Sequence, residues 1–255
     1  MSSPLPGAQR AFGATLALAG ALPRAYPWRM EHDTDIRDRL LDAALGHVAF
    51  DGWTQTSFDA AVQECGLDPV LARGLYPRGA LDLAMAWHRR GDAAMRRRMA
   101  GADLSGMRYR DKVAFALRAR LEAATDREAV RRGTTLFALP MHAADGARLI
   151  WGTADAVWDA LGDSSRDVNW YTKRATLSGV YSATVLFWLG DDSPGHQATW
   201  DFLDRRIEDV MRFEKTKAAL RENRLLAPFL AGPGALLSRI RAPEPPADIP
   251  GGSGH

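Results

Sequence analysis

Apolar residues recur three and four positions apart through most of the chain, and short breaks rich in Gly, Pro or Asp separate the segments that carry them. This spacing places the apolar side chains on one face of an α-helix, and no run alternates as a half-buried strand does. The pattern therefore predicts an all-α helical bundle. The expected helices are Asp35 to Phe50, Ser57 to Cys65, Pro69 to Leu75, Ala80 to Met99, Tyr109 to Ala124, Arg127 to Leu139, Ala144 to Leu161, Trp170 to Leu189 and Pro194 to Lys217, with an interrupted helix following from Ala218.

The segment TQTSFDAAVQECGLDPVLARGLYPRGALDLA has the pattern of a helix, a tight turn and a second helix. Thr56 and Asp59 have the spacing of a capping box, and Gly66 occupies the position of a helix C-cap. Asp68 followed by Pro69 then marks the start of the next helix. The unit resembles the N-terminal helix-turn-helix of TetR-type regulators.

The charge of this unit argues against DNA as its ligand. Residues 31–90 carry a net formal charge of −4, whereas affinity for DNA comes largely from neutralising phosphates. The helix that would enter the major groove begins with Asp68, Pro69 and Val70, and Arg73 is its single base. We therefore expect no nucleic-acid partner, although a TetR-type regulator with a small apolar inducer remains the alternative.

The sequence contains no arrangement of residues that is typical of a catalytic or metal site. Nucleotide-binding glycine motifs, HExxH and serine elbows are absent, and one cysteine, Cys65, allows no internal disulfide. His196 near Asp191 is the best acid/base candidate, but Ser193 and Pro194 are more simply the start of a helix. We expect a chain that is not an enzyme and holds no cofactor or metal.

The stretch from Asp167 to Ile207 carries the motifs that suggest a family. The first motif is Asn169, Trp170, Tyr171, Thr172, Lys173 and Arg174. The second is Asp191, Ser193, Thr199, Trp200, Phe202, Leu203, Arg205 and Arg206. Both resemble motifs of the ubiquinone-biosynthesis accessory family, the ninth numbered coenzyme Q protein of eukaryotes and its alphaproteobacterial relatives.

This resemblance implies a TetR-like fold that no longer binds DNA, a homodimer, a lipid pocket in the helical core, and an amphipathic C-terminal helix that meets membranes. It also implies that the protein presents isoprenoid quinone precursors to the di-iron demethoxyubiquinone hydroxylase. Carried onto this chain, the partner-binding residues are Asp167, Asn169, Trp170, Tyr171 and Arg174. The alternative is that Trp170 caps the core while Lys173 and Arg174 are solvated.

Apolar and aromatic residues on the later helices are candidates for the wall of the lipid pocket. They are Trp151, Trp158, Leu177, Val180, Tyr181, Trp188 and Trp200. Helical periodicity fits each of them equally well as ordinary core.

Residues 215–241 form the most basic segment of the chain, with a net formal charge of +5. Cations and leucines fall on separate arcs of a helical projection, which is typical of a helix lying on an anionic membrane. The expected membrane-binding residues are Arg221, Arg224, Leu225, Leu226, Phe229, Leu230, Leu236 and Leu237. Pro228 and the Gly232-Pro233-Gly234 break interrupt this helix, and docking of the leucines back on the bundle is the alternative.

The expected organisation has five parts. These are a leader or misassigned start (1–29), a helix-turn-helix unit with its connecting helix (30–100), a lipid-binding core with the partner patch (101–216), the membrane-associating segment (217–241) and a disordered tail (242–255). The leader lacks acids and carries Arg10, Arg24 and Arg29, which also suits a secretory signal or a mitochondrial presequence. We expect a bacterial cytoplasmic protein at the inner membrane, with the mitochondrial matrix face as the alternative.

Overall fold

The computed structural model describes residues 27–222, with side chains from 34 to 212, and within this range the chain is helical and contains no strand. The prediction of an all-α fold is confirmed. The helices are α1 (Pro27–Asp51), α2 (Gln55–Glu64), α3 (Pro69–Leu75), α4 (Ala80–Ala100), α5 (Tyr109–Glu122), α6 (Arg127–Ala138), α7 (Ala143–Ala160), α8 (Val168–Leu189), the 3-10 helix η1 (Pro194–His196) and α9 (Gln197–Glu222).

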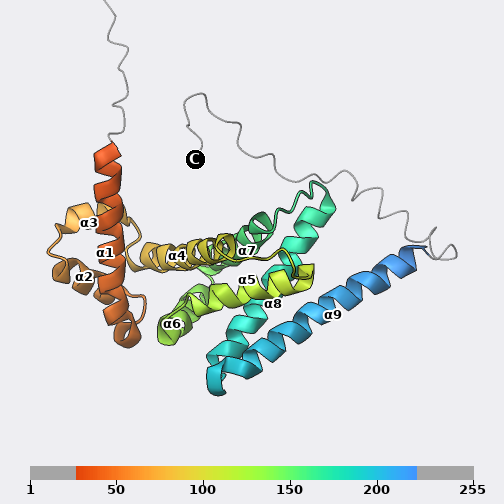
Figure 1. The fold of residues 1–255 in the computed structure, drawn as a ribbon. Helices are drawn as coiled ribbons and strands as arrows, with labels where there is room; N and C mark the ends of the chain where they lie inside the picture. Colours follow the sequence, from red (N-terminus) through yellow and green to blue (C-terminus); the bar gives the residue numbers. More distant parts are fainter. Residues whose placement is uncertain (1–26, 223–255) are drawn as a thin grey trace, which may run out of the picture.

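The helices form two packed groups, and α4 connects them (Figure 1). Helices α1 to α3 and the first half of α4 enclose one apolar cluster, in which Leu40, Val48 and Leu83 are fully buried. The second half of α4 packs with α5, α7, α8 and α9 around another cluster, which includes Met95 and Leu117. Burial of these apolar surfaces is the main stabilising contribution to both groups.

The turn between α2 and α3 has the geometry that the sequence predicts. Gly66 has φ +62°, in the left-handed region that only glycine adopts without strain. The Asp68 carboxylate accepts hydrogen bonds from the backbone N–H groups of Val70 (2.7 Å) and Leu71 (3.1 Å), and Pro69 is the first residue of α3.

The capping box of α2 lies two residues before the predicted one. Thr54 is the N-cap, its hydroxyl accepts from the Ser57 N–H, and the Ser57 hydroxyl accepts from the Thr54 N–H. The prediction of Thr56 and Asp59 is wrong because Ser57 completes the box as well as an acid does, and α2 therefore starts at Gln55.

Two other helices begin earlier than predicted. The first, α1, starts at Pro27, and α8 starts at Val168 with Asp167 as its N-cap. The expected tail, most of the expected leader and all predicted membrane-binding residues except Arg221 lie outside the described residues. Arg221 belongs to the last turn of α9, in the part whose side chains are not described.

Candidate functional site: a partner patch and a cavity

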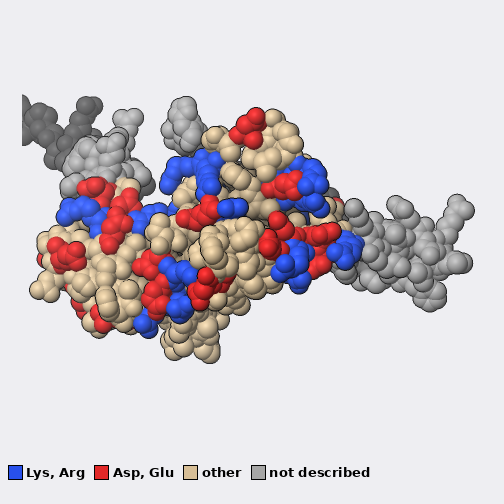
Figure 2. Space-filling model, turned by 60° about the horizontal axis from the view of Figure 1, so that its bottom comes forward, with Lys and Arg blue, Asp and Glu red and all other residues tan. Residues whose placement is uncertain are grey.

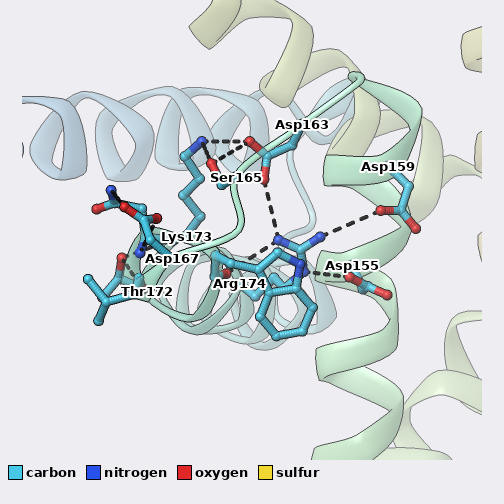
Figure 3. Close-up of polar contacts among 11 residues, drawn as sticks. Asp155, Asp159, Asp163, Ser165, Asp167, Thr172, Lys173 and Arg174 are labelled. Carbon is cyan, nitrogen blue, oxygen red and sulfur yellow. Dashed lines mark hydrogen bonds and ion pairs between the residues drawn. The ribbon is translucent and has the colours of Figure 1, made fainter. Parts of the chain in front are cut away.

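Arg174 on α8 is the centre of a buried ion-pair cluster (Figure 3). Its side chain is 2% exposed, and its Nε donates to Asp155 on α7. Nη1 lies 3.4 Å from the Asp163 carboxylate, which follows α7, and Nη2 lies 3.5 Å from Asp159. The guanidinium therefore ties the end of α7 to the first turns of α8, because a buried charge requires such partners.

An aromatic patch surrounds this cluster and consists of Trp151, Trp170 and Tyr171, each of them partly exposed. The Arg174 guanidinium carbon lies 4.0 Å from the Trp170 ring centroid, a cation–π contact. Trp170 in turn contacts Tyr171 edge-on at 4.8 Å and Trp151 at 5.9 Å. Arg174 is therefore a support beneath the patch, with its guanidinium out of direct reach of a partner in this conformation.

The remaining residues of the first motif fix the start of α8. The Asp167 side chain accepts hydrogen bonds from the Asn169 backbone N–H and side-chain amide. Lys173 Nζ donates to Asp163 (2.6 Å) and to Ser165 (2.7 Å). Lys173 is therefore paired within the protein and is not a freely solvated cation.

Two of the three carboxylates beside Arg174 have pKa values shifted in opposite directions. Burial and the neighbouring Asp155 raise the pKa of Asp159. Although burial opposes its ionisation, hydrogen bonds from Lys173 and Ser165 hold the pKa of Asp163 below the ordinary value. The lowered pKa favours the ionised form of Asp163 as a counter-ion in the cluster. Asp159, whose side chain is 59% exposed, is the most accessible of the carboxylates.

A cavity of about 690 Å³ lies between α4, α6, α7 and α8. Most of its wall is apolar, from Trp53 and Trp87 at one side to Ile150 and Val185 at the other. Leu186 lines it and is 63% exposed, so the cavity opens to solvent beside α8.

The cavity contains two of the residues predicted to line a pocket, Tyr181 and Trp188. The others do not line it. Trp158, Leu177, Val180 and Trp200 are buried in the second apolar cluster, and Trp151 belongs to the aromatic patch. Periodicity finds the buried face of a helix, but whether that face meets another helix or a void depends on the packing.

One end of the cavity is polar. Arg120, 5% exposed, lines it and donates through Nε to Asp92 (2.6 Å) and through Nη2 to the His88 carbonyl (3.0 Å). His88 Nε2 lies 2.9 Å from the Thr153 hydroxyl, which donates to Asp92. Burial, together with the charge of Arg120, lowers the pKa of His88 to about 3, so this imidazole is neutral at physiological pH.

Residues 143–214 match the model of the COQ9 family. The chain carries a COQ9 domain. It is 30% identical to the mitochondrial ubiquinone biosynthesis protein COQ9 of Drosophila melanogaster over 70% of this chain and 56% of that protein. It is 31% identical to the COQ9 protein of Rattus norvegicus over 73% of this chain and 62% of that protein. The chain thus spans about three fifths of the length of these relatives.

A solved TetR transcriptional regulator from Nitrosomonas europaea resembles this chain in fold, with a TM-score of 0.58 and 20% sequence identity. The match covers 68% of this chain and 97% of that structure. The TetR-like fold that the sequence predicts is therefore confirmed, as is the resemblance to the COQ9 family.

The COQ9 domain comprises α7, α8, η1 and most of α9. It contains the whole aromatic patch and the Arg174 cluster. His88, Asp92 and Arg120, at the polar end of the cavity, lie outside the matched segment, and so do the helix-turn-helix residues.

Sequence reasoning missed Asp155, Asp159 and Asp163 as partners of Arg174, and it missed the polar end of the cavity. The sequence does indicate that Asp155 and Asp159 lie on one helix face, because they are four residues apart. No signal in the sequence joins Arg120 to Asp92 and His88, because these residues meet only through the packing of α4 against α5.

His196 lies within the matched segment and packs edge-on against Trp188, with ring centroids 5.9 Å apart. Its Nδ1 lies 4.0 Å from Asp191, beyond hydrogen-bond distance. The Asp191 carboxylate accepts hydrogen bonds from the backbone of Ser193 and from the backbone and side chain of Thr199. These bonds keep the pKa of Asp191 well below its usual range. The prediction that this stretch begins a helix is confirmed, but Asp191 contributes more to the cap than Ser193 does.

The described residues contain neither a membrane-spanning helix nor a metal site. Within residues 27–222, no helix combines the length and apolar content needed to cross a bilayer. In the same part of the chain, no group of His, Cys, Asp or Glu side chains has the geometry to hold a metal ion.

Proposed function

We propose that this chain is an accessory protein of ubiquinone biosynthesis. It binds an isoprenoid quinone precursor and presents it to the di-iron demethoxyubiquinone hydroxylase, without being a catalyst itself. The observation that carries the proposal is the aromatic patch, which lies on a COQ9 domain and is supported from below by a buried arginine. Partly exposed Trp and Tyr side chains of this kind dominate many protein interfaces.

The cavity supports the ligand part of the proposal. Its volume of about 690 Å³ is within the usual range for small-molecule sites, and its wall is mainly apolar. The relatives are named as mitochondrial proteins of ubiquinone biosynthesis. These names favour the mitochondrial alternative for localisation. Peripheral membrane association through residues 217–241 and a homodimer remain parts of the proposal.

Capture of the purified hydroxylase by the full chain tests the partner surface. We expect Trp170→Ala and Tyr171→Ala each to weaken binding about 30-fold, the effect of losing an interface hot spot. Phe50→Ala is the matched control, because Phe50 is an 83% exposed aromatic residue on α1, outside the patch. Unchanged capture by both patch variants would refute the proposed partner surface.

A TetR-type regulator is the second candidate, and the solved regulator from Nitrosomonas europaea favours it at the level of fold. The side chains of α3 argue against DNA binding. The Arg73 guanidinium lies 4.8 Å from the Phe58 ring centroid, inside the unit, and Val70 is 80% exposed where base contacts would form. On the face of the molecule that Figure 2 draws, acidic side chains are interspersed with basic ones, without a continuous basic surface.

A further inference from the structure

The polar end of the cavity combines a buried arginine that is already paired with an aspartate and a histidine that is neutral. We propose that this end selects ligands whose head is neutral and accepts hydrogen bonds, such as a carbonyl or hydroxyl oxygen, over ligands with a carboxylate head or no head. The inference rests on the proposed function, because it takes the cavity to be the site of a long apolar ligand.

Arg120 supplies the donor. Its Nε and Nη2 are occupied by Asp92 and the His88 carbonyl. Among the hydrogen bonds of the described residues, Arg120 donates through these two nitrogens and not through Nη1. Arg120 is nearly buried and lines the cavity, so a ligand oxygen at this end completes its hydrogen bonding. A charged donor that faces a mainly apolar cavity gains a hydrogen bond from a head that can accept one, and this raises the affinity for that head.

The charge balance at this end favours a neutral head. The Arg120 cation is already paired with Asp92, at 2.6 Å, and both side chains are less than 9% exposed. His88 adds no charge, because burial keeps it neutral. A ligand carboxylate at this end would therefore lose its hydration and meet the Asp92 carboxylate, while the cation beside it, Arg120, is already paired.

Gly91 on α4 allows this arrangement. A Cβ atom at this position would lie 2.6 Å from Arg120 Nη1 and 2.7 Å from Cζ, closer than van der Waals contact permits. The absence of a side chain lets the guanidinium lie flat against α4, where it forms the end wall of the cavity. Any larger residue at position 91 displaces the donor.

Three probes with one tail and different heads test the selection: farnesol, farnesene and farnesoate. Each is titrated into the delipidated full chain, and bound ligand is counted by native mass spectrometry. We expect farnesol to bind about tenfold more tightly than farnesene, the effect of one hydrogen bond to a charged donor. We also expect farnesoate to bind less tightly than farnesol.

The double variant Asp92→Leu, Arg120→Met removes the donor without leaving an unpaired buried charge, so it is expected to fold. It should keep farnesene binding and lose the preference for farnesol. Gly91→Ala, which displaces the guanidinium, should reduce that preference as well. Arg97→Met is the matched control, since Arg97 is an exposed cation that lines the cavity outside the polar end, and it should keep the full preference.

The outcomes separate this inference from the proposed function. Three results would each overturn the selection while leaving a lipid-binding cavity: equal binding of farnesol and farnesene, farnesoate binding as tightly as farnesol or more tightly, or an unchanged preference in the double variant. Binding of none of the three probes overturns the ligand part of the proposed function together with the inference.

Discussion

The two arginines that organise the candidate sites, Arg174 and Arg120, are both buried, and each is paired with aspartate. A buried guanidinium is stable when carboxylates and carbonyls satisfy its fixed set of donors. Arg174 was predicted to be a partner contact, with solvation as the alternative, and its burial instead gives it a positioning role beneath Trp170. Asp167, Asn169, Trp170 and Tyr171 remain predicted contacts.

Replacing Arg174 by Met should destabilise the fold by about 3 kcal/mol, the lower end of the effect of breaking a buried ion pair, because Asp155 and Asp159 are partly exposed. Chemical denaturation measures the change. Arg174→Lys should recover only part of it, since an ammonium cannot reach three carboxylates with the geometry of a guanidinium. Equal stability of wild type and Arg174→Met would show that the cluster does not stabilise the fold.

His88 should make the stability depend on pH. Its pKa is about 3 in the folded protein and ~6.5 when unfolded, so the unfolded chain binds the extra proton between these values. The stability that this difference provides is complete above pH 6.5 and is lost as the pH falls towards 3, at about 1.4 kcal/mol per pH unit.

Urea unfolding between pH 6.5 and 5 checks this slope, because most carboxylates titrate below that range. We expect His88→Gln to reduce the slope of the free energy of unfolding against pH. His142→Gln, at the start of α7, should leave it unchanged. A wild-type slope in His88→Gln would mean that another group causes the dependence.

At the scale of elements, sequence periodicity located the helices well, and the errors lie at their ends. The predicted starts of α1, α2 and α8 are late by up to two turns. Helix ends depend on which side chain captures the free N–H groups of the first turn, and the hydroxyls of Thr54 and Thr56 are both chemically able to do so. The apolar positions have the same helical spacing whichever threonine is the N-cap, so they do not determine where α2 starts.

Thr54→Ala should destabilise the protein by about 1 kcal/mol through loss of the N-cap of α2. Thr56→Ala, two residues later, is the matched control, and we expect a change within about 0.5 kcal/mol because surface substitutions away from caps have small effects. Thermal unfolding of both variants measures the difference. A larger destabilisation by Thr56→Ala than by Thr54→Ala would instead identify Thr56 as the N-cap, as the sequence predicted.

At the scale of the whole molecule, the chain combines a regulator-like fold with an acidic helix-turn-helix unit. The solved TetR regulator matches the bundle at 20% identity, whereas residues 31–90 carry a net formal charge of −4. Fold therefore does not determine function here, and the side chains on α3 decide whether DNA can bind.

Fluorescence anisotropy with a labelled palindromic duplex should detect no binding tighter than the weak non-specific range of about 10⁻⁴ M at physiological salt. Lowering the salt to about 50 mM should change little, because the unit has few cations with which to displace counterions. Steeply salt-dependent binding at micromolar protein would instead favour the regulator.

The sequence by itself determined that the chain is helical, where its turns lie, that its N-terminal unit is acidic, and which motifs resemble the ubiquinone-biosynthesis family. These properties depend on local spacing and composition, which a single segment carries. Only the tertiary structure decided that Arg174 lies under Trp170, that Trp151 joins the patch, and that Arg120 and His88 close a cavity. Those contacts join residues on different helices, and their burial and charge balance are set by how the helices pack.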